Sequence, residues 1–66
     1  MDPIKIGEKL RALRGDKAAE EVAKFAGVTP QAVYQYERGE RIPRDEIKIK
    51  LAEYFRKTVT EIFFDV

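Results

Sequence analysis

The sequence predicts an all-α fold, a compact bundle of five helices. Apolar residues recur at spacings of three and four along most of the chain, with charged residues between them, as on the faces of amphipathic helices. Helix-start residues precede these segments and glycines follow several of them. No stretch reads convincingly as a strand, and there is no linker or internal repeat. We therefore expect one domain over residues 1–66.

The first helix is expected at about residues 4–14. Its apolar stripe has the i, i+4, i+7 spacing of one helix face and consists of Ile6, Leu10 and Leu13. Asp2 is a suitable N-cap, Pro3 suits the first turn, and Gly15 is expected to end the helix.

The second helix is expected at about residues 17–26 and to end at Gly27, a residue that tolerates the left-handed conformation. Asp16 is available as its N-cap if the helix starts this early. The apolar face consists of Val22, Ala23, Phe25 and Ala26.

The third helix is expected at about residues 30–38. Thr29 is its N-cap, Pro30 is its first residue, and Val33 and Tyr36 face inward. Only Gly27–Thr29 links it to the second helix, and so short a link favours a steep crossing of the two helices.

Two further helices are expected at about residues 44–56 and 59–64, after a loop. The apolar stripe of the longer one consists of Ile47, Leu51, Tyr54 and Phe55. Thr58 and Glu61 have the spacing of a capping box, in which each side chain accepts a hydrogen bond from the other residue's backbone N–H.

Composition narrows the possible functions. The chain has neither Cys nor His, so the usual zinc ligand sets and Cys/His nucleophiles are missing. Carboxylates occur at capping and ion-pair spacings, without a phosphate-binding glycine loop, so we expect no enzyme, metal, cofactor or small-molecule ligand. We see no signal peptide or membrane span and expect a cytoplasmic protein without membrane contact. The net charge of +1 does not by itself indicate nucleic-acid binding.

Two helices joined by a tight glycine turn, the second with a polar outer face, form a helix-turn-helix pattern. The second helix of such a pair presents its non-apolar face to a groove of DNA. The first helix supports it and directs its N-terminus at a phosphate.

Several stretches then resemble the Cro-type, phage-repressor-like (XRE) family of helix-turn-helix transcription regulators. They are IGEKLRALRGDK, EEVAKFAGVTPQAVYQYERGERIP and LAEYF followed by VTEIF. The resemblance runs from about Ile4 to Phe63. It implies the lambda-repressor-like DNA-binding fold, with the second and third helices as the helix-turn-helix.

The resemblance assigns roles to residues around the third helix. The implied base-reading residues are Pro30, Gln31, Ala32, Tyr34 and Gln35, and the implied phosphate contacts are Lys17, Thr29, Arg38, Arg41 and Arg44. A Gln amide can pair with adenine and an Ala methyl with the thymine methyl. Tyr34 either stacks on the DNA backbone or covers an apolar surface. We expect Glu37 to pair with an Arg of the chain, and Arg11 and Arg14 to lie on a solvated face.

The chain departs from the family in two places. Relatives place Ser-Gln where this chain has Ala18 and Ala19, and a lost N-cap costs about 0.5–2 kcal/mol. The missing Gln removes a contact that positions DNA, so we expect weaker affinity with specificity retained. In the fourth helix, Asp45 and Lys48 replace buried leucines, and Arg56 replaces a terminating Gly.

The apolar C-terminal segment predicts a homodimer. The expected interface residues are Phe63, Phe64 and Val66, with Phe64 at the centre. Two-fold symmetry implies a palindromic operator with recognition helices about 34–36 Å apart. The function expected is a small dimeric repressor that binds specific double-stranded DNA. The alternative is a protein-interaction module, or antitoxin-like partner, that has lost DNA binding on the same fold.

Overall fold

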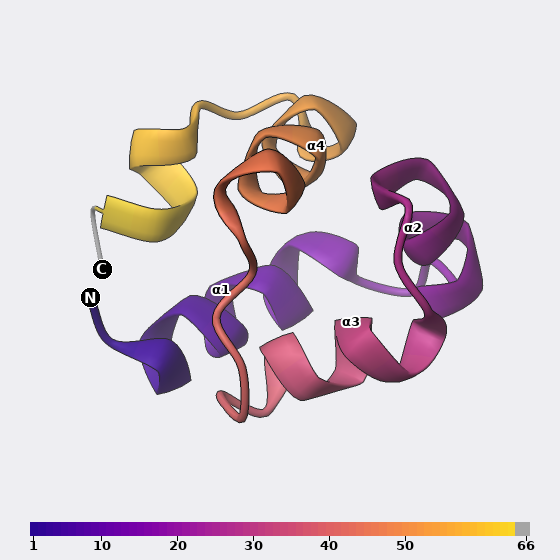
Figure 1. The fold of residues 1–66 in the computed structure, drawn as a ribbon, viewed down its shortest axis with the longest axis horizontal. Coiled ribbons are helices and arrows are strands. Elements are labelled where there is room, and N and C mark those ends of the chain that lie inside the picture. Colours follow the sequence, from indigo (N-terminus) through magenta and orange to yellow (C-terminus); the bar gives the residue numbers. More distant parts are fainter. Residues whose placement is uncertain (65–66) are drawn as a thin grey trace.

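A computed structural model of the chain describes residues 1–64. It contains helices α1 (Pro3–Arg14), α2 (Ala19–Ala26), α3 (Pro30–Glu37) and α4 (Asp45–Phe55) and the short π-helix η1 (Thr60–Phe64) (Figure 1). There is no strand among the described residues, so the predicted all-α, five-helix fold is confirmed. None of these helices is long and apolar enough to cross a membrane.

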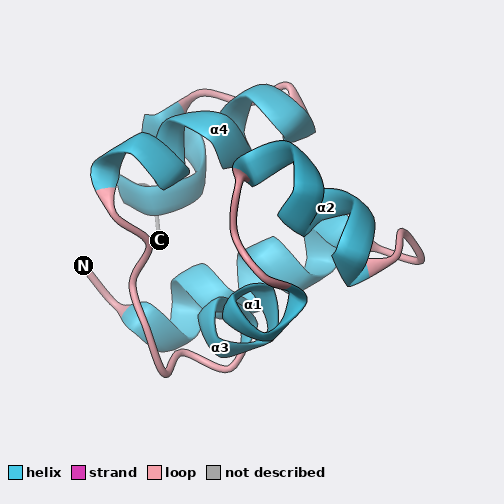
Figure 2. Cartoon of the chain, turned by 45° about the vertical axis from the view of Figure 1, so that its right-hand side comes forward, coloured by secondary structure: helices cyan, strands magenta, loops and turns pink. Residues whose placement is uncertain are grey.

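The helices surround one core. α1 packs on α3, α2 packs on both α3 and α4, and η1 closes the bundle against α1 (Figures 1 and 2). The largest fully buried side chains come from four of the five elements and are Ile6, Val22, Leu51, Ile62 and Phe63. The core therefore fixes α3 from behind and leaves its other face outside.

Two predicted N-caps are confirmed. The Asp2 carboxylate accepts hydrogen bonds from the backbone N–H groups of Ile4, at 3.0 Å, and Lys5, at 3.2 Å. The Thr29 hydroxyl accepts one from the N–H of Ala32, at 3.1 Å. Each satisfies donors that a helix start otherwise leaves free.

The start of α2 differs from the prediction. The helix begins at Ala19, because Lys17 turns back and donates its N–H to the Arg14 carbonyl, at 3.0 Å. Ala18 occupies the N-cap position without a side-chain hydrogen bond, and Asp16 does not cap the helix.

The α2–α3 connection has the predicted tight geometry. Gly27 ends α2 in the left-handed conformation, with φ of 78°. Two N–H groups, of Gly27 and Val28, then donate to the Ala23 carbonyl, which closes the helix. The chain passes directly into α3, and the two helices cross steeply (Figure 1).

A glycine in α1 explains how closely α1 and α3 approach. A Cβ atom at Gly7 would lie 2.6 Å from the Tyr36 carbonyl oxygen and equally against that of Glu37. Any larger residue would therefore push α1 away from the end of α3. The sequence analysis did not single out Gly7.

Helix α4 packs its predicted stripe against the core, and Lys48 and Ala52 beside that stripe are buried as well. Leu51 and Ala52 are buried, whereas Ile47, Tyr54 and Phe55 are only half-buried. Lys48 is 8 % exposed, with its ammonium near the Phe63 and Phe64 rings and 3.4 Å from the exposed Asp45. Arg56 ends the helix in the left-handed conformation, with φ of 57°, as expected where relatives have Gly.

The last helix confirms the capping box and corrects the expected dimer contacts. The Thr58 N–H donates to Glu61 at 2.8 Å, and the Glu61 N–H donates to the Thr58 hydroxyl at 3.0 Å. Phe63 is 0 % exposed because it fills the core, so its assignment to a dimer interface was wrong. Phe64 is 58 % exposed. Val66 lies outside the described residues.

Candidate nucleic-acid interface

The outward face of α3 carries polar side chains on a rigid support. Gln31 and Tyr34 are exposed, and Pro30 and Gln35 are half-buried beside them. Val33 and Tyr36 point into the core, as predicted, and hold the opposite side of the helix. Helical spacing thus presents one row of side chains to the outside from a helix that cannot rotate freely.

Ala32 does not belong to this outward face. It is 6 % exposed and lies in the core. The expectation that its methyl group contacts a base is therefore corrected. Ala32 precedes Tyr36 by four residues, so it lies on the same buried face of α3.

Gln35 and Arg41 connect α3 to the loop that follows it. Arg41 Nη1 donates a hydrogen bond to Gln35 Oε1, at 3.2 Å, and the guanidinium lies 5.8 Å from the centroid of the Tyr36 ring. With its oxygen engaged, Gln35 keeps its amide N–H groups as free donors. The arrangement places a positive charge directly beside the outer face of α3.

Arg38 is paired within the loop. Its Nε lies 2.8 Å from Glu40 Oε2, and both side chains are about half exposed. The hydrogen bond to Glu40 raises the pKa of Arg38, and the same bond lowers the pKa of the Glu40 carboxyl. Glu40 engages Nε and Nη2, so the Nη1 donors of Arg38 remain available to an anion, but the carboxylate offsets part of its charge.

The other expected phosphate contacts lie on exposed surface near the helix starts. Lys17 precedes α2, Thr29 precedes α3, and Arg44 precedes α4. The Thr29 hydroxyl accepts the capping hydrogen bond and keeps its own O–H as a donor, so all three side chains remain available to a phosphate.

Arg14 is a supporting residue of this site that the sequence analysis placed wrongly. It was expected on a solvated face, but its side chain is 12 % exposed and pairs with Glu37, itself 7 % exposed. Two bonds join them, Nε to Oε2 at 2.6 Å and Nη2 to Oε1 at 3.0 Å. The predicted pairing of Glu37 with an Arg is thereby confirmed.

The same guanidinium reaches two more parts of the site. Arg14 Nη1 donates to the Lys17 carbonyl oxygen at 2.8 Å, and the guanidinium carbon lies 5.6 Å from the centroid of the Tyr34 ring. Hydrogen bonding to Glu37 raises the pKa of Arg14. Arg14 therefore ties α1 to α3 and to the turn before α2.

This geometry agrees with a comparison against known protein families. The model of the helix-turn-helix family matches residues 8–62, which include all of α2, the turn and α3. The chain belongs to the helix-turn-helix family. The resemblance noted in the sequence is thus confirmed.

Solved structures of other helix-turn-helix proteins share the fold. The restriction-modification controller protein C.AhdI from Aeromonas hydrophila is 33 % identical with a TM-score of 0.84, over 94 % of this chain and 97 % of that one. The phage P22 c2 repressor, solved in complex with a synthetic operator, is 25 % identical with a TM-score of 0.87, over 92 % and 96 %.

The SOS-response repressor LexA from Eubacterium rectale is 29 % identical with a TM-score of 0.87. That match covers 97 % of this chain and 70 % of LexA. No curated protein sequence matches the chain significantly.

Proposed function

We propose that the chain is a DNA-binding transcription regulator that inserts α3 into the major groove of a specific operator. The observation that carries the proposal is the outward face of α3, where exposed polar side chains stand on a buried, fixed helix beside exposed arginines. Helix-turn-helix proteins dock in this way, with the second helix of the pair against base edges. The solved relatives named above include a repressor bound to its operator.

Base reading is assigned to Gln31 and Gln35, with Tyr34 and Pro30 in contact beside them. A Gln amide presents a donor and an acceptor that match the major-groove edge of adenine. The bond from Arg41 occupies one lone pair of Gln35 Oε1 and fixes the amide orientation. We expect Gln35 to act mainly as a donor toward a purine N7.

Phosphate binding is assigned to Lys17, Arg38, Arg41 and Arg44, with the backbone at Thr29. Contacts of this kind set the register of a protein on DNA and contribute affinity without reading sequence. Each phosphate that a cationic side chain neutralises releases counterions. The slope of log affinity against log salt concentration therefore gives the number of these contacts.

The regulator is proposed to act as a homodimer through the surface formed by Ile49, Val59 and Phe64, which we call the α4–η1 patch. Ile49 is 53 % and Phe64 58 % exposed, and both border one surface hollow with Lys48. A two-fold dimer would repress by occupying a palindromic operator. We propose further that residues 1–66 act as one cytoplasmic domain without catalytic activity.

The dimer is tested by sedimentation of Phe64→Asp. We expect a monomer, because a buried carboxylate at the seam is left unpaired. Phe25→Asp is the matched control, since Phe25 is an exposed aromatic on α2, and it should leave the dimer intact. A wild-type monomer, or a Phe64→Asp dimer, contradicts the assignment.

A protein-interaction module is the second candidate, favoured by the uncapped start of α2 at Ala18 and by the Arg38–Glu40 pair, which reduces the free positive charge. The two functions differ in salt dependence. Four cationic contacts in each protomer of a dimer predict a slope of log affinity against log salt of about −7. Absence of DNA binding at low salt by the folded protein supports the interaction module.

A further inference from the structure

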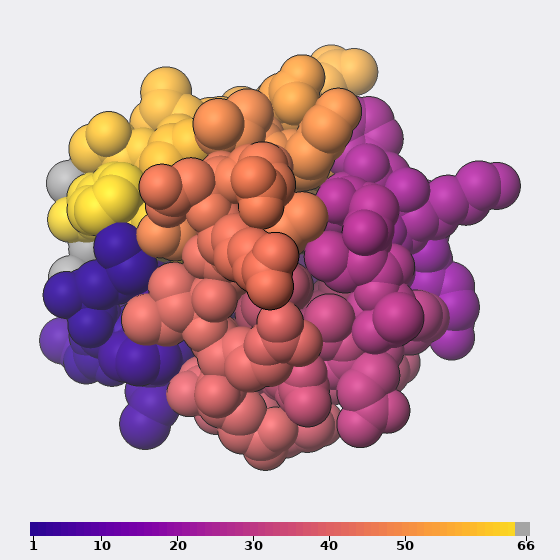
Figure 3. Space-filling model, in the orientation of Figure 1, coloured from indigo at the N-terminus to yellow at the C-terminus, as the bar shows by residue number. Residues whose placement is uncertain are grey.

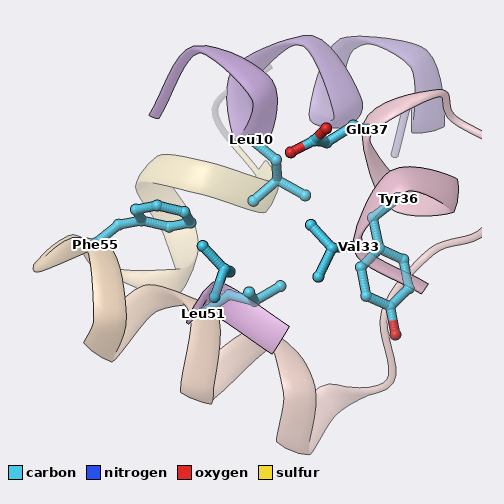
Figure 4. A pocket seen from close by; sticks show the side chains of 7 residues that line it. Leu10, Val33, Tyr36, Glu37, Leu51 and Phe55 are labelled. Atoms are coloured by element: carbon cyan, nitrogen blue, oxygen red, sulfur yellow. The ribbon is translucent and has the colours of Figure 1, made fainter. Parts of the chain in front are cut away.

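Within residues 1–64, the hydroxyl of Tyr36 has no hydrogen-bond partner, although the ring lies in the core. Tyr36 is 3 % exposed. Among residues 1–64, the Tyr54 hydroxyl donates to Glu21, but no protein group hydrogen-bonds the Tyr36 hydroxyl. In this part of the chain, every fully buried side-chain nitrogen or oxygen atom has a hydrogen-bond partner. Because the Tyr36 oxygen has none, it must be accessible to solvent. Figure 4 shows it pointing away from Leu10 and Val33.

Tyr36 lines a surface pocket of about 200 Å³ between the α2–α3 turn and the start of α4. Val28 and Ile47 form its apolar walls with the Tyr36 ring, while Arg41, Arg44 and Glu46 line its polar side. In the space-filling view, the surfaces of the turn and of residues 40–47 adjoin on one face of the molecule (Figure 3). A water molecule takes about 30 Å³ in the liquid, so the pocket has room for a group of several heavy atoms.

The chemistry of the pocket suits an anion with strong acceptor oxygens. Two guanidinium groups face one carboxylate, so the lining is positive overall. A phenol hydroxyl without a partner offers a donor, and a charged acceptor makes the stronger hydrogen bond. Arg41 also bonds to Gln35 on the outer face of α3, which places the pocket at the edge of the surface proposed to read DNA.

We propose that this pocket holds one phosphate of the DNA backbone, with Tyr36 as a donor between Arg41 and Arg44. The inference rests on the proposed function and adds a contact residue from the core of α3. It connects backbone binding to base reading, because Arg41 touches both the pocket and Gln35. Glu46 opposes the phosphate and limits the affinity.

The test compares Tyr36→Phe with wild type on two labelled duplexes, an operator obtained by selection and a scrambled sequence, over a salt series. We expect affinity to fall about tenfold or more on both duplexes, since a hydrogen bond to a charged group is lost. The salt slope should stay unchanged because a phenol releases no counterion. Arg44→Gln should instead reduce the slope by about one unit per protomer.

Tyr54→Phe is the matched control, because its hydroxyl bonds Glu21 on another face of the molecule, and it should bind as wild type does. An unchanged affinity for Tyr36→Phe, or a loss on one duplex only, overturns the phosphate pocket while leaving DNA binding in place. Failure of wild type to bind either duplex overturns the proposed function as well.

A second measurement uses the wild-type protein alone and does not depend on the stability of a variant. With ¹³C-labelled tyrosine, the Cζ resonance of Tyr36 should shift when the operator is added, while that of Tyr54 should not. An unshifted Tyr36 resonance at saturating operator overturns the proposal.

Discussion

Arg14 of α1 and Glu37 of α3 form a largely buried ion pair with two hydrogen bonds, whose N–O distances are 2.6 and 3.0 Å. The two residues lie 23 positions apart in the sequence. Since the guanidinium also lies against Tyr34 and bonds the carbonyl of Lys17, this pair fixes α3 relative to α1 and to the start of α2.

Arg14→Met should lower the free energy of unfolding by about 3 kcal/mol, because it leaves the Glu37 carboxylate buried without a partner. The free energy of unfolding of a small protein is about 0.05–0.15 kcal/mol per residue, so this loss is a large part of the total stability of so short a chain. Urea unfolding measures it. The double variant Arg14→Met/Glu37→Met should recover much of the loss, and Arg11→Met on the exposed side of α1 is the control. Equal losses for Arg11→Met and Arg14→Met would contradict the structural role of the pair.

Arg56→Gly should stabilise the fold by about 1 kcal/mol. Arg56 has a φ of 57°, a conformation that costs a residue with a Cβ about 1–2 kcal/mol and costs Gly nearly nothing. The N–H groups of Arg56 and Lys57 bond to the last turn of α4 and are retained in the variant. Lys57→Gly is the control: Lys57 does not have a positive φ, so this variant should not be stabilised. A melting temperature of Arg56→Gly at or below that of wild type would disprove the prediction.

Glu61 should titrate below the ordinary Glu range. Hydrogen bonds from the Thr58 backbone and hydroxyl lower the pKa of the Glu61 carboxyl. A lowered pKa in the folded state means that the capping box stabilises the protein above the unfolded pKa and that this contribution is lost as the pH falls through the folded value. NMR titration should show the low pKa, and Thr58→Ala should raise it. An unchanged pKa in Thr58→Ala would show that the hydroxyl is not a cause, because the variant keeps the backbone N–H bond to Glu61.

Glu40→Gln should tighten DNA binding several-fold on every sequence. The change removes a negative charge beside the proposed phosphate surface and frees Arg38, which is bound to Glu40 at 2.8 Å. Fluorescence anisotropy with a labelled duplex measures the effect. Glu53→Gln, on the exposed side of α4, is the charge-matched control and should change affinity little. Weaker binding by Glu40→Gln would indicate that Glu40 positions Arg38 for its phosphate.

The features that could be predicted from the sequence are those set by neighbouring residues. The Asp2 and Thr29 caps, the Gly27 turn and the Thr58–Glu61 box each depend on residues at most five apart, so the sequence pattern contains the whole interaction. The inward positions of Val33 and Tyr36 follow from helical spacing in the same way.

The features that could not be predicted depend on packing between distant segments. Arg14 looks like a surface residue until α3 brings Glu37 to it, and Phe63 looks like an interface residue until η1 packs it into the core. Ala32 could have been placed in the core by the same spacing as Tyr36, four residues later, but the resemblance to DNA-reading positions led to the other assignment. Gly7 carried no local signal, because its importance lies in the backbone of α3 against it.

The most direct test of the central claim, that α3 reads specific DNA, is selection of bound duplexes from a random DNA pool by the purified protein, followed by sequencing. We predict an enriched palindrome with half-sites about one turn, ~34–36 Å, apart. In the same selection, Gln35→Ala should lose the preference at one base pair of each half-site. No enrichment by the folded wild-type protein would contradict the account and favour the protein-interaction function.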